Sequence, residues 1–449
     1  MKLKLLLPVA MAALMIQPAY SVTEYEFQEM QEKLQNAIIK INAMEQVIKS
    51  NADNKSGSVK TKSKKGLTID TTGGGIKVKS GDQSFAIGGR LMMDYDSMDS
   101  NHNSNGKSFD DTEWRRTRIN IKGSVNKNWS YKATYDFNSE KDTANLDEGY
   151  IKYDSKQGLT ITAGKTKADM MLEQRTSSKW ISTVERGLLN AMNEKVNYLV
   201  GKPGDGAGVK LGFYDKDSRI SGAFSVFDAY KNDDDDDKSN IWHTTARLTY
   251  SPKMNNGFGH FGVTYGVADY KGQETKADIQ LGIHQGDKTL LAIESDTGDI
   301  TNIGVEAAYV NGPFSLQGEY FDNETEKDNG TKGYEWDGYY GQVSYILTGE
   351  TRGYKWKSGA FDKVKPAGKI GAWELVLRYE DISVDDLSEG TVSANKVDID
   401  RTVLGLNWYA TKTVKFMANY SSVSMDNMTN EAGDTDDLDS FQFRAQYAF

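Results

Sequence analysis

Apolar and charged residues alternate with a period of two along many short segments after residue 84. In the segment TRINIK, for example, Ile119 and Ile121 alternate with Arg118, Asn120 and Lys122. A period of two indicates a β-strand with two chemically different faces. An Arg or Lys that faces lipid at mid-membrane costs about 2 to 4 kcal/mol, so the charged face must meet water and the apolar face lipid. The pattern predicts an all-β fold, a transmembrane antiparallel β-barrel with a wet interior.

The alternation recurs in about sixteen segments, an even number as in single-chain bacterial barrels. Short connections such as 126–128 and 411–413 alternate with long polar ones such as 97–112, as expected for the periplasmic and external ends of a barrel. Two segments fit less well: 273–299 is compatible with an additional small hairpin, and 349–370 would be long for the periplasmic end. We expect strands near residues 84–96, 113–125, 129–138, 146–154, 159–165, 206–215, 219–228, 241–251, 259–268, 300–311, 313–322, 335–348, 371–383, 399–410, 414–425 and 438–449.

The C-terminal segment SFQFRAQYAF has the same pattern and ends the chain on an aromatic residue. Phe441, Phe443 and Tyr447 alternate with Gln442 and Arg444. A last strand that faces lipid must pair with the first strand, because an open sheet edge in the bilayer would leave backbone groups without partners. The segment therefore predicts a closed barrel.

The alternation stops for almost forty residues between residues 165 and 203 and then resumes. This stretch is rich in Lys, Arg, Met and Trp, and unstructured loops of this length inside a compact domain are usually functional or disordered. We expect it to fold into the lumen as a constriction loop that narrows the barrel. The alternative is a surface helix and loop packed outside.

Composition supports a barrel over a large globular core. Apolar residues reach only 38%, yet the 449 residues include 24 Tyr, 16 Phe and 8 Trp, which barrels place at membrane interfaces. The mature chain has no run of 18 apolar residues, so no membrane-spanning helix is predicted. Cysteine is absent, which excludes disulfides and thiolate chemistry, and a net charge of −10 argues against nucleic acid as a partner.

The first 66 residues divide into three segments ahead of a barrel domain at 67–449. Residues 1–21 combine two lysines, an apolar run and small residues before a cleavage point, as in a secretory signal peptide. Residues 22–49 carry an apolar heptad, which predicts a periplasmic coiled coil compatible with three strands, or else a lone amphipathic helix on its own barrel. Residues 50–66 are polar and cationic, as in a flexible linker. The heptad positions are Phe27, Met30, Leu34, Ala37, Ile41, Met44 and Ile48.

Several extended blocks are typical of a known family: WRRTRINIKGSVNKNWSYKATYDF, DEGYIKYDSKQGLTITAGK, TSSKWISTVERGLLNAM, GYYGQVSYILTGETRGY, GAWELVLRYEDIS, VLGLNWYATKTVKFMANY and the closing FRAQYAF. From about residue 67 to residue 449 the chain resembles the phosphate-selective porin O and P family of Gram-negative outer membranes. The resemblance implies a sixteen-stranded homotrimeric porin whose third external loop folds inward and which prefers anions, phosphate or polyphosphate. It also implies outer-membrane lipid, lipopolysaccharide and small solutes or inorganic anions as partners, with neither cofactor nor metal.

Basic residues are the candidates for lining the pore and selecting anions, because positive charge offsets the desolvation of an anion in a narrow passage. The resemblance places Ser177 to Lys179 and Glu185-Arg186 in the constriction loop. Each candidate could instead pair with a carboxylate to hold the fold. The candidates are Arg90, Arg116, Arg118, Lys122, Lys132, Lys165, Lys167, Arg175, Lys179, Arg186 and Arg247.

Acidic residues oppose a strong anion preference. Glu148, Glu306, Glu319 and Glu374 also point inward by the same alternation, and the external segment 232–238 reads NDDDDDK. Such acidic runs are usually solvated, although a bridging cation such as calcium is conceivable. A general or cation-tolerant porin without phosphate selectivity is therefore the alternative function.

Two further classes of protein remain open from the sequence. The first is a barrel enzyme, but the four histidines, His102, His243, His260 and His284, are in no recognised nucleophile motif. The second is a barrel that anchors a periplasmic coiled-coil tether. A hydrolase assay would separate the enzyme from a pore, and liposome swelling would separate the tether from a pore.

Overall fold

The computed structural model describes residues 61–62, 66–98, 109–137, 145–196, 207–229, 241–281, 283–284, 288–386, 396–426 and 438–449. The predicted signal peptide and the heptad at 22–49 lie outside the described residues, as does most of the predicted linker. Residues 60–449 form one compact unit, and the description below concerns that unit alone. No helix in the described ranges combines the length and the hydrophobicity needed to cross a bilayer.

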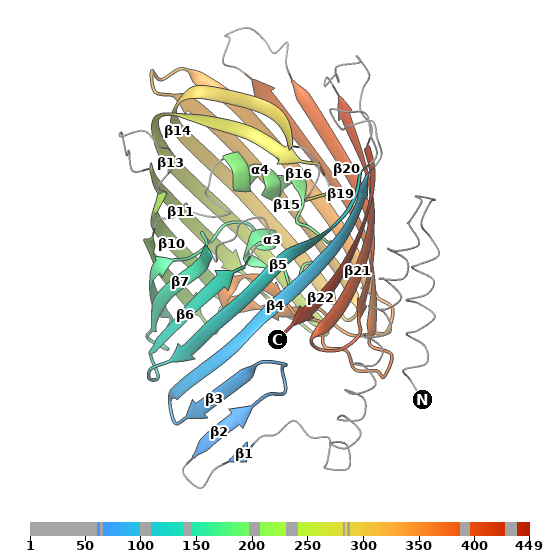
Figure 1. Ribbon diagram of the computed structural model, residues 1–449. Helices are drawn as coiled ribbons and strands as arrows, with labels where there is room; N and C mark the ends of the chain where they lie inside the picture. Colours follow the sequence, from blue (N-terminus) through green and yellow to red (C-terminus); the bar gives the residue numbers. More distant parts are fainter. Residues whose placement is uncertain are drawn as a thin grey trace, which may run out of the picture. The chain divides into compact units, whose positions relative to one another are not determined.

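Sixteen of the described strands form a closed antiparallel barrel, as the alternation predicted (Figure 1). Each strand pairs with the next in sequence, and the last pairs with the first from Ser440 opposite Met98 to Ala448 opposite Arg90. The strands are β4 (Gln83–Met98), β5 (Phe109–Ser124), β6 (Trp129–Asp136), β7 (Asn145–Asp154), β8 (Leu159–Lys165), β9 (Gly208–Asp215), β10 (Ile220–Ala229), β11 (Ile241–Tyr250), β13 (Gly257–Gln280), β14 (Lys288–Asn311), β15 (Phe314–Lys327), β16 (Lys332–Ile346), β19 (Ala372–Asp386), β20 (Val397–Tyr409), β21 (Val414–Asp426) and β22 (Leu438–Ala448).

Most of the predicted strand bounds are close to those observed. The segment 273–299, where the sequence is compatible with a small hairpin, forms a hairpin that is continuous with β13 and β14 and extends both strands, with Ala277 opposite Ala292 and bulges near Gln273. The hydroxyls of Thr275 and Thr297 lie 2.7 Å apart between the two extensions. The extensions carry many polar residues, so they lack the apolar alternation that identifies strands within the bilayer.

Toward the external end of the barrel, the apolar residues of the wall lie on the inner face and the polar residues on the outer face. On β19, Leu377 is 51% exposed on the outside, whereas Ile382 is fully buried inside and Asp381 lies on the outer face. On β20, Leu404 is 55% exposed outside, whereas Ile399 is buried inside. The expectation that the apolar face is always outside was therefore wrong beyond the bilayer. There the outer face meets water, and the inner face packs on protein.

The constriction loop after β8 fills that inner space, which confirms the predicted inward fold. It contains α3 (Leu172–Arg175) and α4 (Leu188–Val196), and α4 packs against β13, β16 and β19. Leu188, Leu189 and Met192 join one apolar cluster with wall residues that include Trp336 and Ile382. The alternative, a surface helix packed outside the barrel, is excluded.

The long turn between β16 and β19 also folds inward. It contains β17 (Gly353–Lys355), the 3-10 helix η3 (Trp356–Ser358) and β18 (Ala360–Asp362). The hydroxyl of Tyr354 lies 2.5 Å from Nδ1 of His260 on β13, and the Phe361 backbone N–H donates to Thr176 Oγ1 at 3.1 Å. The turn therefore braces the constriction loop from the periplasmic side.

A short antiparallel segment of three strands, called the hairpin below, precedes the barrel. It consists of β1 (Thr61–Lys62), β2 (Leu67–Asp70) and β3 (Ile76–Ser80), and β3 pairs with the first residues of β4. Thr61–Lys62 falls within the range expected to be a flexible linker. A further two-residue strand, β12 (Lys253–Met254), pairs with the start of β13.

Candidate functional site

The constriction loop is anchored to the wall through Glu185. Its carboxylate accepts hydrogen bonds from Arg115 at 3.0 Å and Arg116 at 3.1 Å on β5, and from Arg444 on β22. Burial disfavours a charged carboxylate, but these three arginines outweigh burial and hold the pKa of Glu185 well below its usual range. The loop is thus fastened to the seam where the barrel closes.

A β-bulge explains how two consecutive arginines both reach Glu185. The register between β4 and β5 shifts between Met92 and Asp94, which inserts an extra residue opposite that point. Strict alternation assigns Arg115 to the lipid face, so sequence reasoning did not include it as a candidate. The bulge turns Arg115 inward beside Arg116.

A second anchor is Glu173 in α3. Arg378 on β19 donates to both of its oxygens, at 2.6 and 3.1 Å, and the backbone N–H of Gly187 donates to it at 3.0 Å. The backbone N–H groups of Leu172 and Glu173 in turn donate to the buried Glu319 on β15, at 2.7 and 2.8 Å. These bonds fix the position of the loop in the lumen.

Most of the arginines predicted to line the pore are paired with carboxylates. Arg118 binds Asp136 and Asp147, both at 2.6 Å. The further pairs are Arg116 with Glu185, Lys132 with Glu148, Arg175 with Asp169 at 2.6 Å and Arg247 with Glu306 at 2.6 Å. Arg186 donates to loop carbonyls of Thr176 at 2.9 Å and Glu173 at 3.3 Å. For these residues the alternative interpretation, a role in holding the fold, agrees with the geometry.

Three of the predicted residues form a cationic group without an ion pair among the described residues. Arg90 donates a hydrogen bond to the hydroxyl of Ser178, while Lys122 and Lys179 have no carboxylate partner in the part of the chain that the structure describes. The pKa of Lys179 falls to about 7, first because of burial and then because of repulsion by Arg90 and Lys122. We call Arg90, Lys122 and Lys179 the basic cluster.

The inward glutamates, which the sequence analysis weighed against anion preference, also bind wall and loop residues. Glu306 binds Arg247 and lies 3.0 Å from Nε2 of His260. Glu374 accepts hydrogen bonds from Ser182 at 3.1 Å in the constriction loop and from Asn407 at 2.9 Å. Together with Glu319 and with Glu148, which pairs with Lys132, these carboxylates position the loop and its supports.

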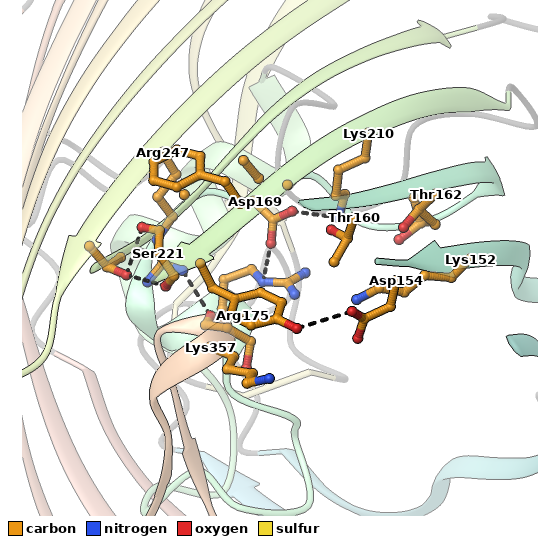
Figure 2. Close-up of a pocket in the computed structure, with 18 of the residues that line it drawn as sticks. Lys152, Asp154, Thr160, Thr162, Asp169, Arg175, Lys210, Ser221, Arg247 and Lys357 are labelled. Atoms are coloured by element: carbon orange, nitrogen blue, oxygen red, sulfur yellow. Dashed lines mark hydrogen bonds and ion pairs between the residues drawn. The ribbon is translucent and has the colours of Figure 1, made fainter. Parts of the chain in front are cut away.

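A cavity of about 180 Å³ lies between the lumenal wall and η3 (Figure 2). Five basic and three acidic side chains line it, together with the hydroxyls of Thr160, Thr162 and Ser221. Asp169 joins Arg175 and Lys210 at 2.6 Å each, as the dashed lines in Figure 2 show. This volume holds several water molecules, and hence a small hydrated anion.

Sequence reasoning missed the other basic residues of this cavity. Lys152 and Lys210 alternate with Ile151 and Leu211, so the period of two was a sufficient signal for both. Lys357 lies in η3, where no alternation exists, and its Nζ lies 3.7 Å from the centre of the Tyr214 ring. The predicted Lys165 and Lys167 lie half-buried where the constriction loop begins, and the Lys167 carbonyl accepts a hydrogen bond from Lys210 at 2.8 Å.

Among the described residues, one group of carboxylates is close enough to share a metal ion: Asp94, Asp96 and Glu113, with ligand atoms within 4.8 Å of one another. Protein groups already bind all three. Arg444 donates to Asp94 at 2.7 Å, Gln442 donates to Asp96 at 3.1 Å, and His284 Nδ1 lies 2.9 Å from Glu113. We therefore assign this group to the arginine–carboxylate framework around Glu185.

The comparison with known families decides the identity of the barrel. A sequence model of phosphate-selective porin O and P matches residues 85–449. The chain belongs to the phosphate-selective porin O and P family. Porin O of Pseudomonas aeruginosa is 32% identical to this porin over 411 residues, which cover 84% of this chain and 92% of that relative. The resemblance predicted from the sequence blocks is confirmed.

Solved porin structures share the fold of this porin. An anion-selective porin from Comamonas acidovorans superposes with a TM-score of 0.54 at 12% identity, covering 82% of this chain and all of that one. OmpT of Vibrio cholerae superposes with a TM-score of 0.53 at 14% identity, covering 83% of this chain and 99% of that one. Family membership indicates an outer-membrane channel for this porin rather than an enzyme.

Proposed function

We propose that this porin is a water-filled channel that passes small hydrophilic solutes and prefers small inorganic anions of the phosphate class. The observation that carries the proposal is the basic cluster, in which Arg90 bonds to Ser178 next to Lys179 and both Arg90 and Lys122 repel the charge of Lys179, without ion pairs among the described residues. Membership of a phosphate-selective family and the likeness to Porin O support the same preference.

The channel selects solutes by the width of its pore and by the electric field of its fixed charges. An anion that enters a narrow passage loses part of its hydration, and fixed positive charges with nearby hydroxyls offset that loss. Ser178 holds the guanidinium of Arg90 in place, so the cluster has a defined geometry before an anion arrives. The cavity lined by Lys152, Lys210 and Lys357 provides a second basic stretch.

The same charges argue against the alternative of a cation-tolerant porin. An excess of inward carboxylate would attract cations, but Glu306, Glu319 and Glu374 accept hydrogen bonds from wall or loop groups. Their negative charge is therefore balanced or spread over donors, while no carboxylate of the described residues pairs with the basic cluster.

A block experiment tests phosphate as the anion. We expect inorganic phosphate, added to a chloride solution, to reduce the single-channel chloride current of the purified porin in a planar bilayer. Lys179→Gln should weaken this block, because one charge of the basic cluster is lost. The matched control, Lys216→Gln in the turn after β9, should leave it unchanged. A chloride current that ignores phosphate in the unmodified porin would contradict the proposal.

We further propose that three copies assemble in the outer membrane, with the N-terminal coiled coil in the periplasm. The apolar heptad from Phe27 to Ile48 supports a trimeric coil. The outer wall supports contact with lipid and lipopolysaccharide, since large apolar side chains such as Leu377 and Leu404 are half-exposed there. A barrel that only anchors a tether would share the coil but would show no conductance.

A further inference from the structure

The hairpin β1 to β3 is amphipathic, although it lies outside the ring of sixteen strands. Directly opposed residues of antiparallel strands point to the same face. Ile69 is opposite Val78, which is opposite Phe85 of β4, and Ile76 is opposite Ile87. These five residues therefore share one apolar face, which we call the hairpin face.

The opposite side of the hairpin is polar. Thr68 is opposite Lys79, which is opposite Ser84, and Asp70 is opposite Lys77. Ser84 belongs to the set of β4 residues that faces the lumen together with Arg90. The hairpin thus extends the two faces of the barrel wall past the point where the barrel closes (Figure 1).

The hairpin is held firmly against the seam of the barrel. β22 pairs with β4 only from Arg90 onward, and β3 takes over the same edge of β4 from Gln83 to Ile87. Between them, Gly89 and the C-terminal Phe449 exchange two backbone hydrogen bonds, at 2.8 and 3.1 Å. A Cβ on Gly75 would lie 2.4 Å from the Ile87 carbonyl oxygen, so only glycine allows this close approach.

The hairpin face is exposed in the single chain. Ile76 is 50% exposed, Phe85 39%, and Ile69 and Ile87 37% each. A sheet of two or three short strands is stable only when its apolar face is covered. Lipid does not suit this hairpin, because among the described residues β1 pairs with β2 alone, and an open sheet edge in hydrocarbon leaves backbone groups unsatisfied. Protein therefore suits the hairpin face better than lipid does.

We propose that the hairpin face packs against the outer wall of a second copy of this chain and joins the subunits on the periplasmic side. This inference rests on the trimer proposed above. The face is continuous with the wall, since Ile87 of β4 is opposite Ile121 of β5, so one apolar surface runs from the barrel onto the hairpin. A neighbour packed on that wall would cover both.

The length of chain ahead of the hairpin favours the same occupant. Residues 49–60, which separate the heptad from β1, span at most about 40 Å when extended. A three-stranded coil at 22–49 would therefore hold three hairpins close together, which raises their effective concentration for one another. A separate protein would have no such advantage.

Photo-crosslinking tests the proposal. Because the porin has no native cysteine, a thiol-reactive probe labels its chain at the introduced cysteine alone. The porin with Ile76→Cys is labelled with a benzophenone maleimide in outer membranes that contain both tagged and untagged chains. After illumination, tagged chains are purified in denaturant and probed for untagged ones. Lys79→Cys, on the polar face of the same strand, is the matched control, and Ile69→Cys is a second probe of the hairpin face.

We expect about tenfold more tagged-to-untagged product from position 76 than from position 79, because the probe reacts only with groups in contact. The linked peptide should come from the outer face of the barrel strands. Products confined to one chain, adducts with lipopolysaccharide or adducts with another protein would each overturn the proposal. Unheated gels run in parallel separate the two failures: trimers without cross-chain product refute the hairpin contact alone, and monomers refute the trimer as well.

Discussion

Arg378 on β19 donates two hydrogen bonds to Glu173 in the constriction loop, and both side chains are buried. The pair joins residues 205 positions apart in the sequence. Arg378 also binds Glu380, and Glu380 binds Arg401, so the loop is tied into a charged chain that runs along the wall. The position of the constriction therefore depends on buried ion pairs.

Breaking this pair should free the loop without opening the barrel. Removing one partner of a buried ion pair typically costs about 3 to 5 kcal/mol, because the other charge is left uncompensated. We expect Glu173→Gln to raise single-channel conductance and open-channel noise, as α3 loses its ion pair with Arg378. Glu335→Gln, at a partly exposed residue on the outer face of β16, is the control. A quiet channel with unchanged conductance would show that Glu173 does not position the constriction.

Deleting residues 176–193 should widen the pore and raise its conductance. The deletion removes most of α4 from the lumen. It also removes Lys179 of the basic cluster together with Glu185, the partner of Arg115, Arg116 and Arg444, so the conductance and not the ion preference is the quantity to compare. Single-channel recordings measure it. Equal conductance would contradict the role of the loop as a constriction.

The anion preference should fall as pH rises through neutrality. A lysine is charged below its pKa and neutral above it, and the pKa of Lys179 is lowered to about 7 by burial and by the neighbouring cations. The charge of Lys179 is therefore present at pH 6 and mostly absent at pH 8.5. Reversal potentials at the two pH values should differ, and Lys179→Met should reduce the difference. A bound phosphate would favour the charged lysine, so added phosphate should shift the midpoint to higher pH.

A pH-independent reversal potential between these values would mean that Lys179 does not contribute its charge to the passing ion. Lys216→Met serves as the control, since Lys216 lies in an exposed turn after β9. Its pH profile should match that of the unmodified porin.

The heptad can be tested apart from the barrel. Replacing Leu34 and Ile41 by Asp places charges in the predicted coil core, which should abolish coil formation. Trimers held by the barrel walls should persist on unheated gels, with reduced resistance to heating. Loss of every trimer would show that the coil, and not the wall, is the main contact between subunits.

The alternation of residues such as Arg118 and Ile119 was sufficient to predict the membrane-spanning part of each strand and the closure of the barrel. It failed where the environment changes. Beyond the bilayer the outer face meets water, so Ile399 turns inward and the sequence signal reverses. It failed again at the bulge that turns Arg115 inward, because an inserted residue leaves no mark in the composition of a strand.

The candidate site was predictable as a set of basic residues but not as a geometry. Alternation places both Arg118 and Lys122 in the lumen, yet only the register with the neighbouring strands brings Asp136 next to Arg118 and places Lys132, not a carboxylate, opposite Lys122. The partners of Arg247 and Arg378 come from distant strands and from the constriction loop. Such pairs depend on the tertiary fold, which local patterns do not encode.

The most direct test of the account is the reversal potential of the porin in a planar bilayer with a gradient of potassium chloride. The unmodified porin should show a potential of the sign given by chloride carrying most of the current. Replacing Lys122 and Lys179 together by Gln should move the potential toward zero or beyond, whereas Lys216→Gln, in the exposed turn after β9, should change it much less. A potential that is cation-selective in the unmodified porin, or unmoved by the double replacement, would contradict the central role of the basic cluster.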